Sequence, residues 1–222
     1  MRFFHWITAL LFPPKCVLCG RILEKEETDL CHSCRVDNPE CGAHRRKFTF
    51  LAGSVAVWYY EGHARESILR YKFRGTRAYA QCYGRMLAMK LTREFPEGFD
   101  VLTWVPISAQ RLRERGFDQV ELLAEFVGKE LGMQPEKLLN KIRNNPPQSG
   151  ISGEAERRAN VLGAYRVTDP EMVRGKRILI LDDVITTGAT VSEAARMLLT
   201  AGAKQVCCGA VAVVRRGGKN SR

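Results

Sequence analysis

The chain has 222 residues, of which 45% are hydrophobic and 27% charged, and it carries a formal net charge of +11 with a pI near 9.5. The length allows one domain of ordinary size plus a small module, and the composition, without repeats or low-complexity tracts, excludes a disordered or repetitive chain. The positive charge favours anionic partners such as nucleic acid, polyphosphates or the inner membrane surface, although solubility alone would also account for it.

The N-terminal segment Phe3 to Phe12 is apolar, but it is too short to span a bilayer and no small-residue cleavage site follows it. We expect a short amphipathic helix docked on the core, with weak peripheral membrane contact as the alternative. Because the cysteine pattern that follows is typical of a reducing compartment, the sequence predicts a cytoplasmic protein without a transmembrane segment.

Four of the eight cysteines form two Cys-x-x-Cys pairs, a spacing typical of a tetrahedral zinc ribbon, with redox or disulfide use as the alternative. These cysteines are Cys16, Cys19, Cys31 and Cys34. A closed four-sulfur site would be structural, because it leaves no open position for chemistry. The candidate substitute ligands are His32, Cys41 and His44. We expect residues 1–50 to form a helix and a metal-dependent ribbon, and residues 51–222 to form the main domain.

The main domain should open with a strand over residues 53–60, followed by helices over about 61–73 and 77–95. Lys72, Arg74 and Arg77 make a basic corner with aromatic residues between them. This pattern suits binding of phosphate or stacking of bases, and a solvated helix end is the alternative.

A buried strand is predicted over residues 100–106, stopped by Pro106, and a helix over about 119–131. Between them lies a loop with Arg111, Arg113 and Arg115. Arginines at the carboxyl end of a strand are well placed to receive a pyrophosphate or a nucleic-acid backbone.

Residues 143–160 are polar and rich in proline and glycine, between short strands expected near 137–141 and 161–167. Long loops of this kind are often functional lids, so we expect a mobile flap, with plain disorder as the alternative. The side chains that could close over an anionic ligand are Arg143, Gln148, Arg157 and Arg158.

The most informative stretch runs from Ile178 to Thr190. Four apolar residues predict a central parallel strand that ends at Asp182 and Asp183, and a helix should follow over 191–201. In open α/β sheets this strand end, loop and helix N-terminus form the ligand crevice. Amide groups and hydroxyls of Thr186 to Thr190 suit a monophosphate, and the two carboxylates suit vicinal ribose hydroxyls. The alternative is an ordinary cap on a strand–turn–helix.

This stretch resembles the phosphoribosyl-pyrophosphate (PRPP) signature of type I phosphoribosyltransferases. The resemblance implies that Asp182 and Asp183 hold the ribose and take part in any catalysis, that the following loop holds the 5′-phosphate, and that Mg²⁺ bridges the pyrophosphate. The residues implied in PRPP binding are Asp182, Asp183, Val184, Ile185, Thr186, Thr187, Gly188, Ala189 and Thr190. A last strand is expected over 204–214, before a basic, flexible tail.

The order of motifs along the whole chain resembles the bacterial ComF family. Ahead of the PRPP signature come the cysteine pair behind Pro13-Pro14, the segments Tyr71–Gly75 and Arg115–Gln119, and Gln148 with Arg157 to Gly163. The resemblance implies a zinc ribbon fused to an α/β, type I phosphoribosyltransferase-like domain with a mostly parallel sheet flanked by helices. It also implies handling of incoming single-stranded DNA in natural transformation, sometimes beside a competence helicase.

The chain departs from the family pattern at two places. The family commonly has Asn where this chain has Asp118, and it often has a third Cys-x-x-Cys pair where this chain keeps only Cys41. The second departure suggests one zinc ion rather than two. Three hypotheses follow: a PRPP-binding protein that handles single-stranded DNA, which we favour; an active phosphoribosyltransferase with an unidentified base or amine acceptor; and a PRPP sensor without catalysis.

Overall fold

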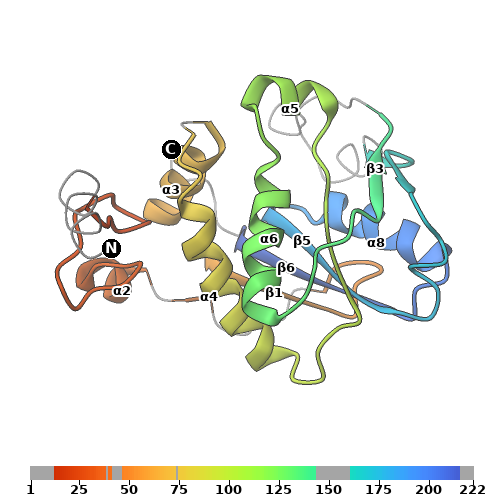
Figure 1. Ribbon diagram of the computed structural model, residues 1–222, viewed down its shortest axis with the longest axis horizontal. Helices are drawn as coiled ribbons and strands as arrows, with labels where there is room; N and C mark the ends of the chain where they lie inside the picture. The colour runs from red at the N-terminus through yellow and green to blue at the C-terminus, as the bar shows by residue number, and fades with distance from the viewer. Residues whose placement is uncertain (1–12, 39, 42–46, 74, 144–160, 216–222) are drawn as a thin grey trace, which may run out of the picture.

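The computed structural model describes residues 13–38, 40–41, 47–73, 75–143 and 161–215 (Figure 1). Its centre is a parallel sheet with the strand order β1-β6-β5-β2. The strands are β1 (Gly53–Tyr59), β2 (Val101–Trp104), β5 (Arg177–Ile185) and β6 (Gln205–Val213). The predicted α/β fold with a parallel sheet is therefore confirmed, and β5 occupies an interior position because its apolar residues are buried on both faces.

Helices cover both faces of this sheet (Figure 1). Leu179 and Leu181 pack in the core with α4 and α6, whereas Ile178 and Ile180 pack with α8. The helices are α2 (His32–Asp37), α3 (Gly62–Phe73), α4 (Tyr79–Glu94), α5 (Ala109–Arg115), α6 (Gln119–Leu131) and α8 (Ala189–Thr200). A small antiparallel pair, β3 (Leu139–Lys141) and β4 (Tyr165–Val167), lies beside α8.

Two predicted elements differ from the structure. β5 does not end at the acidic pair but runs on to Ile185, because its backbone stays paired with β6 as far as Val213. The predicted arginine loop contains a seven-residue helix, α5. Ser108 caps the N-terminus of α5, since its hydroxyl accepts a hydrogen bond from Arg111 N, and Gly116 ends it at φ 73°.

Several predicted features lie outside the described residues. They are the helix over Phe3 to Phe12, the flap beyond Arg143 with Gln148, the tail after Arg215, and the side chains of His44, Arg74, Arg157 and Arg158. Among the helices that the structure describes, none combines the length and apolarity needed to cross a membrane.

The cysteine-rich segment packs directly against the main domain. Val17 and Leu18 are buried, and their carbonyl oxygens accept hydrogen bonds from the side chains of Ser67 and Arg70 on α3. Asp29 forms a two-pronged ion pair with Arg85 of α4. The segment therefore gains stability from packing on α3 and α4, in addition to any bound metal.

The helices α4 and α6 meet closely at Gly84, which is buried. A Cβ atom at this position would lie 2.5 Å from Cβ of Phe126 on α6. Real Cβ atoms do not approach so closely, so the two helices can keep this separation only with glycine there.

Replacing Gly84 with alanine is expected to lower the stability of the fold by roughly 1–3 kcal/mol, because the added methyl group forces the helices apart. For a chain of this length that loss corresponds to a fall in Tm of about 2–4 °C per kcal/mol, measurable by circular dichroism. Gln81→Ala on the exposed face of α4 is the matched control and should leave the Tm unchanged. Equal Tm values for Gly84→Ala and the wild type would contradict the packing described.

Candidate functional site

The sulfur atoms of the two Cys-x-x-Cys pairs lie together, all within 4.8 Å of one another. The Sγ atoms of Cys19 and Cys31 are 3.7 Å apart. Tetrahedral coordination with zinc–sulfur bonds of about 2.3 Å requires sulfur atoms roughly 3.8 Å apart, so the cluster Cys16, Cys19, Cys31 and Cys34 fits a structural Zn²⁺. Within the described part of the chain this is the one such group of potential ligands.

The proposed substitute ligands do not join this cluster where the structure describes them. Cys41 is buried in the part of the core that contains the apolar residues of α8, and its backbone N–H donates to the carbonyl oxygen of Val57. His32 begins the short helix α2, where its N–H donates to Glu27. Neither residue is needed, because the four cysteines already complete a tetrahedral set.

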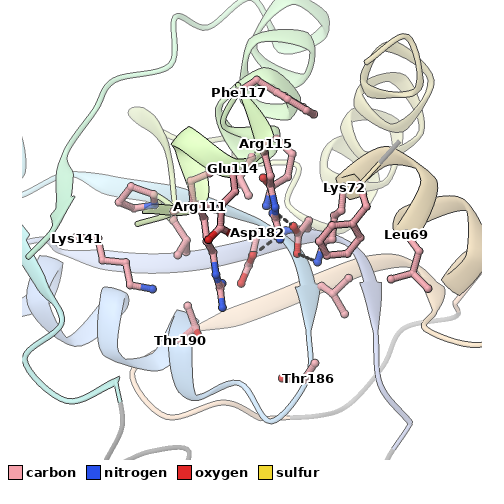
Figure 2. Close-up of a pocket in the computed structure, with 18 of the residues that line it drawn as sticks. Leu69, Lys72, Arg111, Glu114, Arg115, Phe117, Lys141, Asp182, Thr186 and Thr190 are labelled. Atoms are coloured by element: carbon pink, nitrogen blue, oxygen red, sulfur yellow. Dashed lines mark hydrogen bonds and ion pairs between the residues drawn. The ribbon is translucent and has the colours of Figure 1, made fainter. Parts of the chain in front are cut away.

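A cleft of about 820 Å³ opens at the carboxyl end of the sheet, where α3, α5 and the end of β5 meet (Figure 2). This is the place where open α/β sheets bind their ligands. Its charged lining combines two carboxylates of β5 with five cationic side chains and one further carboxylate from α3, α5 and β3. These residues are Asp182, Asp183, Arg65, Lys72, Arg111, Glu114, Arg115 and Lys141.

Asp183 is held by two partners on the α3 and α6 side of β5. Nζ of Lys72 lies 2.7 Å from its Oδ1, and Nε2 of Gln119 donates to its Oδ2 over 2.8 Å. The hydroxyl of Tyr71 in turn donates to the backbone carbonyl of Gln119 at 2.5 Å. Lys72, predicted as an anion-binding residue, is therefore the counter-ion of Asp183 in this structure (Figure 2).

The two carboxylates of the acidic pair differ in environment because neighbouring side chains of a strand alternate between faces. Burial and the charge of Asp183 raise the pKa of Asp182 to about 8. Burial alone would raise the pKa of Asp183 as well, but the ammonium of Lys72 and the hydrogen bond from Gln119 lower it below its usual value. The pair therefore holds a proton more readily on Asp182 than on Asp183.

This arrangement predicts that stability changes with pH through Asp182. The folded protein keeps a proton there that the unfolded chain releases above the ordinary pKa of 3.8, so the wild type loses stability as the pH rises from about 4 to about 8. Asp182→Asn removes this loss, and the Tm of the variant should exceed that of the wild type by an amount that grows across this interval to several degrees. A Tm difference that is constant with pH would count against the raised pKa of Asp182.

The loop that follows β5 brings two of its threonines to the cleft, Thr186 and Thr190 (Figure 2). The hydroxyl of Thr187 instead accepts from the backbone N–H of Ala189 at the start of α8. Gly188 has φ 86°, and a Cβ there would overlap the ring of Phe48, so both conformation and packing require glycine. Of the other predicted PRPP residues, Val184 lines the cleft and Ile185 is buried below it.

The helix α5 separates the three predicted arginines. Arg111 and Arg115 are one turn apart on the same face and both line the cleft, whereas Arg113 is exposed and is not part of the cleft lining. Asp118 fixes this helix relative to α6, since its carboxylate accepts from Val120 and Glu121 and also from the N–H of Ile107. Asp118 therefore ties the residues before α5 to the N-terminus of α6 through both of its carboxylate oxygens.

Lys141 and Gln119 are two of the cleft residues that were not among the predicted site residues. Lys141 of β3 reaches the cleft from the α8 side, where burial lowers its pKa (Figure 2). Gln119 is almost fully buried and contacts Asp183 across 64 residues of sequence. Arg143, which was predicted, is exposed and donates to the carbonyl oxygen of Leu162 rather than lining the cleft.

Comparison with known proteins agrees with this architecture. Residues 7–45 match the family described as Double zinc ribbon domain, and residues 121–222 match the Phosphoribosyl transferase domain. Competence protein ComFC of Bacillus subtilis (strain 168) is 29% identical over 189 residues, covering 84% of this chain and 72% of that protein. DNA utilization protein YhgH of Escherichia coli (strain K12) is 29% identical over 203 residues, covering 86% of each.

The chain belongs to the ComF family. Competence protein ComFC of Streptococcus pneumoniae (strain ATCC BAA-255 / R6) is a further relative, 27% identical over 226 residues that cover 86% of this chain and 96% of that protein. Among solved structures, the allosteric regulatory enzyme of purine biosynthesis aligns with a TM-score of 0.43 and 22% identity, over 64% of this chain. This ComF chain spans 30% of the length of that enzyme.

Proposed function

We propose that this ComF protein binds PRPP with Mg²⁺ in the cleft at the end of β5 and handles single-stranded DNA. One observation carries the proposal: a carboxylate pair, a threonine loop at the N-terminus of α8 and a set of cations from α3, α5 and β3 converge on a single cleft. A sugar with a phosphate at one end and a pyrophosphate at the other offers a matching partner to each of these groups.

In this proposal the loop from Thr186 to Thr190 binds the 5′-phosphate, using amides at the start of α8 and the two threonine hydroxyls in the cleft. Asp182 and Asp183 accept hydrogen bonds from the ribose hydroxyls. Arg111 and Arg115 face the pyrophosphate from α5, a geometry that suits an anion with several oxygens.

Mg²⁺ prefers oxygen ligands and commonly binds through one or two carboxylates together with substrate phosphates. The donor set of the cleft fits this preference, since the carboxylates of Asp182 and Asp183 line it. The ion would neutralise the pyrophosphate charge when it is bound. The ionised form of Asp182 would bind Mg²⁺ and accept hydrogen bonds more strongly than the protonated form, so the affinity for PRPP should rise as the pH rises towards 8.

The DNA-handling part of the proposal rests on charge and on the relatives. The chain carries 35 Lys and Arg against 24 Asp and Glu, and proteins with such an excess attract polyanions. Two kinds of relative bear the names "Competence protein" and "DNA utilization protein". None of the eight cysteines forms a disulfide, which agrees with a proposed cytoplasmic location.

Two titrations test the proposal. Isothermal calorimetry with PRPP and Mg²⁺ should give one saturable site, and fluorescence anisotropy with labelled oligo-thymidylate should give binding that weakens steeply with salt. Several phosphate contacts predict a loss of about 10³-fold or more between low and moderate salt. Absence of PRPP binding would refute the first part, and DNA binding that is absent or insensitive to salt would refute the second.

Catalysis is a second candidate function, and the size of the cleft favours it. At about 820 Å³ the cleft lies in the upper range of small-molecule sites, with room for an acceptor beside a sugar phosphate. In this reaction the bond between C1 of the ribose and the pyrophosphate oxygen breaks, C1 bonds to a nitrogen of the acceptor, and the acceptor loses a proton. Release of pyrophosphate from PRPP with bases and amines tests it, and no release with any acceptor would reject it.

A further inference from the structure

One wall at the mouth of the cleft carries an exposed aromatic ring. Phe73 is the last residue of α3, and 66% of its surface is accessible although it lines the cleft. The guanidinium carbon of Arg115, at the end of α5, lies 4.9 Å from the centre of this ring. An exposed ring in the lining of a cleft, beside a guanidinium group, offers a flat face on which a base can stack.

A second pair of the same type stands next to the first. The guanidinium carbon of Arg77 lies 4.7 Å from the ring centre of Phe117, which also lines the cleft. Phe117 in addition packs edge-on against Tyr71, 6.0 Å between centres, so this ring is fixed in place. Phe73 of α3, Arg115 of α5, Arg77 after α3 and Phe117 after α5 therefore form two arginine–phenylalanine pairs at one opening.

The charges around this opening favour a polyanion. Arg65 on α3 and Arg111 on α5 also line the cleft. Besides Asp182 and Asp183, the acidic residue of the cleft lining is Glu114. The side chain of Glu114 already accepts a hydrogen bond from Gln110 at 2.9 Å. Aromatic rings and guanidinium planes set among cations are the features that bind the bases and phosphates of single strands.

We propose that the ring of Phe73 is a stacking site for a base of single-stranded nucleic acid, with Arg65 and Arg77 on the flanking phosphates. This inference rests on the proposed DNA handling and deepens it, because it places the strand at the mouth of the PRPP cleft. A base stacks on the exposed ring of Phe73, and Arg115 holds that ring from the side of α5.

The test compares oligo-thymidylate with an abasic oligonucleotide of the same length, which has the phosphates but no bases. Phe73→Leu should weaken binding of oligo-thymidylate by about 5- to 100-fold, because the stacking of one base is lost, and should leave binding of the abasic strand unchanged. Phe73→Trp should retain the affinity, and the emission of the new tryptophan should be quenched by oligo-thymidylate. Phe50→Leu, at an exposed phenylalanine that does not line the cleft, is the matched control.

The outcomes separate this inference from the proposed function. Salt-sensitive binding of oligo-thymidylate by the wild type that is unchanged in Phe73→Leu would overturn the stacking site and leave DNA handling intact. An equal loss for both oligonucleotides would also overturn it, because Phe73 would then act on the phosphates or on the fold. If the wild type binds neither strand, the proposed DNA handling fails together with the inference. If the wild type bound a free nucleobase at Phe73 but bound no oligonucleotide there, the inference would likewise be overturned.

Discussion

Replacing Cys16 with serine is expected to abolish zinc binding and to produce a large loss of stability. Binding of a structural zinc ion supplies on the order of 10 kcal/mol in small ribbons, whose own apolar core is minimal. Cys16 is fully buried, and Val17 and Leu18 after it carry the carbonyl oxygens that bind Ser67 and Arg70 of α3. We expect a fall in Tm of about 10 °C or more, with loss of amide protection across residues 13–38 in hydrogen exchange.

Cys82→Ser is the matched control for this prediction. Cys82 is also a buried cysteine, but it lies on α4 outside the metal cluster, so its variant should keep one zinc ion per chain by atomic emission. Treatment of the wild type with a chelator should reproduce the loss of protection seen in Cys16→Ser. A Cys16→Ser protein with a full complement of zinc and the wild-type Tm would show that the cysteines do not form the site.

The zinc ribbon is also connected to the cleft through a short path of contacts. Ser67 and Arg70, which bind the backbone of the first cysteine pair, lie on the same helix as Tyr71 and Lys72. Lys72 in turn pairs with Asp183. Loss of the metal should therefore disturb the helix that holds Asp183 ionised, and a stability defect in the ribbon should lower the affinity for PRPP as a secondary effect.

The elements that local sequence signals determine were predictable. The helix over residues 119–131 has the predicted bounds, because its apolar stripe is flanked by Asp118, which caps its N-terminus, and by Gly132 at φ 68°. The buried run Ile178 to Leu181 likewise predicted a central parallel strand. α5 has no buried residue, so its only signals were Ser108 before it and Gly116 after it, and these were not used.

The partners inside the cleft could not be predicted in the same way. Lys72 and Asp183 are separated by 111 residues, and no local pattern indicates which cation meets which carboxylate. Asp is depleted in strands, so the sequence predicts that the strand ends at the acidic pair, whereas pairing with β6 carries the strand past it. As a result, the alternation that gives Asp182 and Asp183 different neighbours, and different pKa values, became visible only in the folded chain.

The double variant Asp182→Asn/Asp183→Asn is expected to lose PRPP binding while it keeps DNA binding. Each carboxylate that accepts hydrogen bonds from the ribose contributes roughly 1.5–3 kcal/mol, so loss of both should weaken binding of PRPP with Mg²⁺ by more than about 100-fold. Calorimetry measures this loss. A single strand at the mouth of the cleft depends on cations and rings, so its affinity in anisotropy should stay within about threefold of the wild type or rise slightly as two negative charges disappear.

Asp169→Asn/Glu171→Gln makes the same change of charge at two exposed positions away from the cleft, and it should leave both affinities unchanged. The single variants separate the contributions of the two carboxylates. Asp182→Asn keeps the ion pair of Lys72 with Asp183, whereas Asp183→Asn leaves that partly buried ammonium without its carboxylate and should cost more stability. If the folded double variant lost PRPP and DNA binding together, the two ligands would share the acidic pair, and the separation of the sugar-phosphate site from the stacking surface would be wrong.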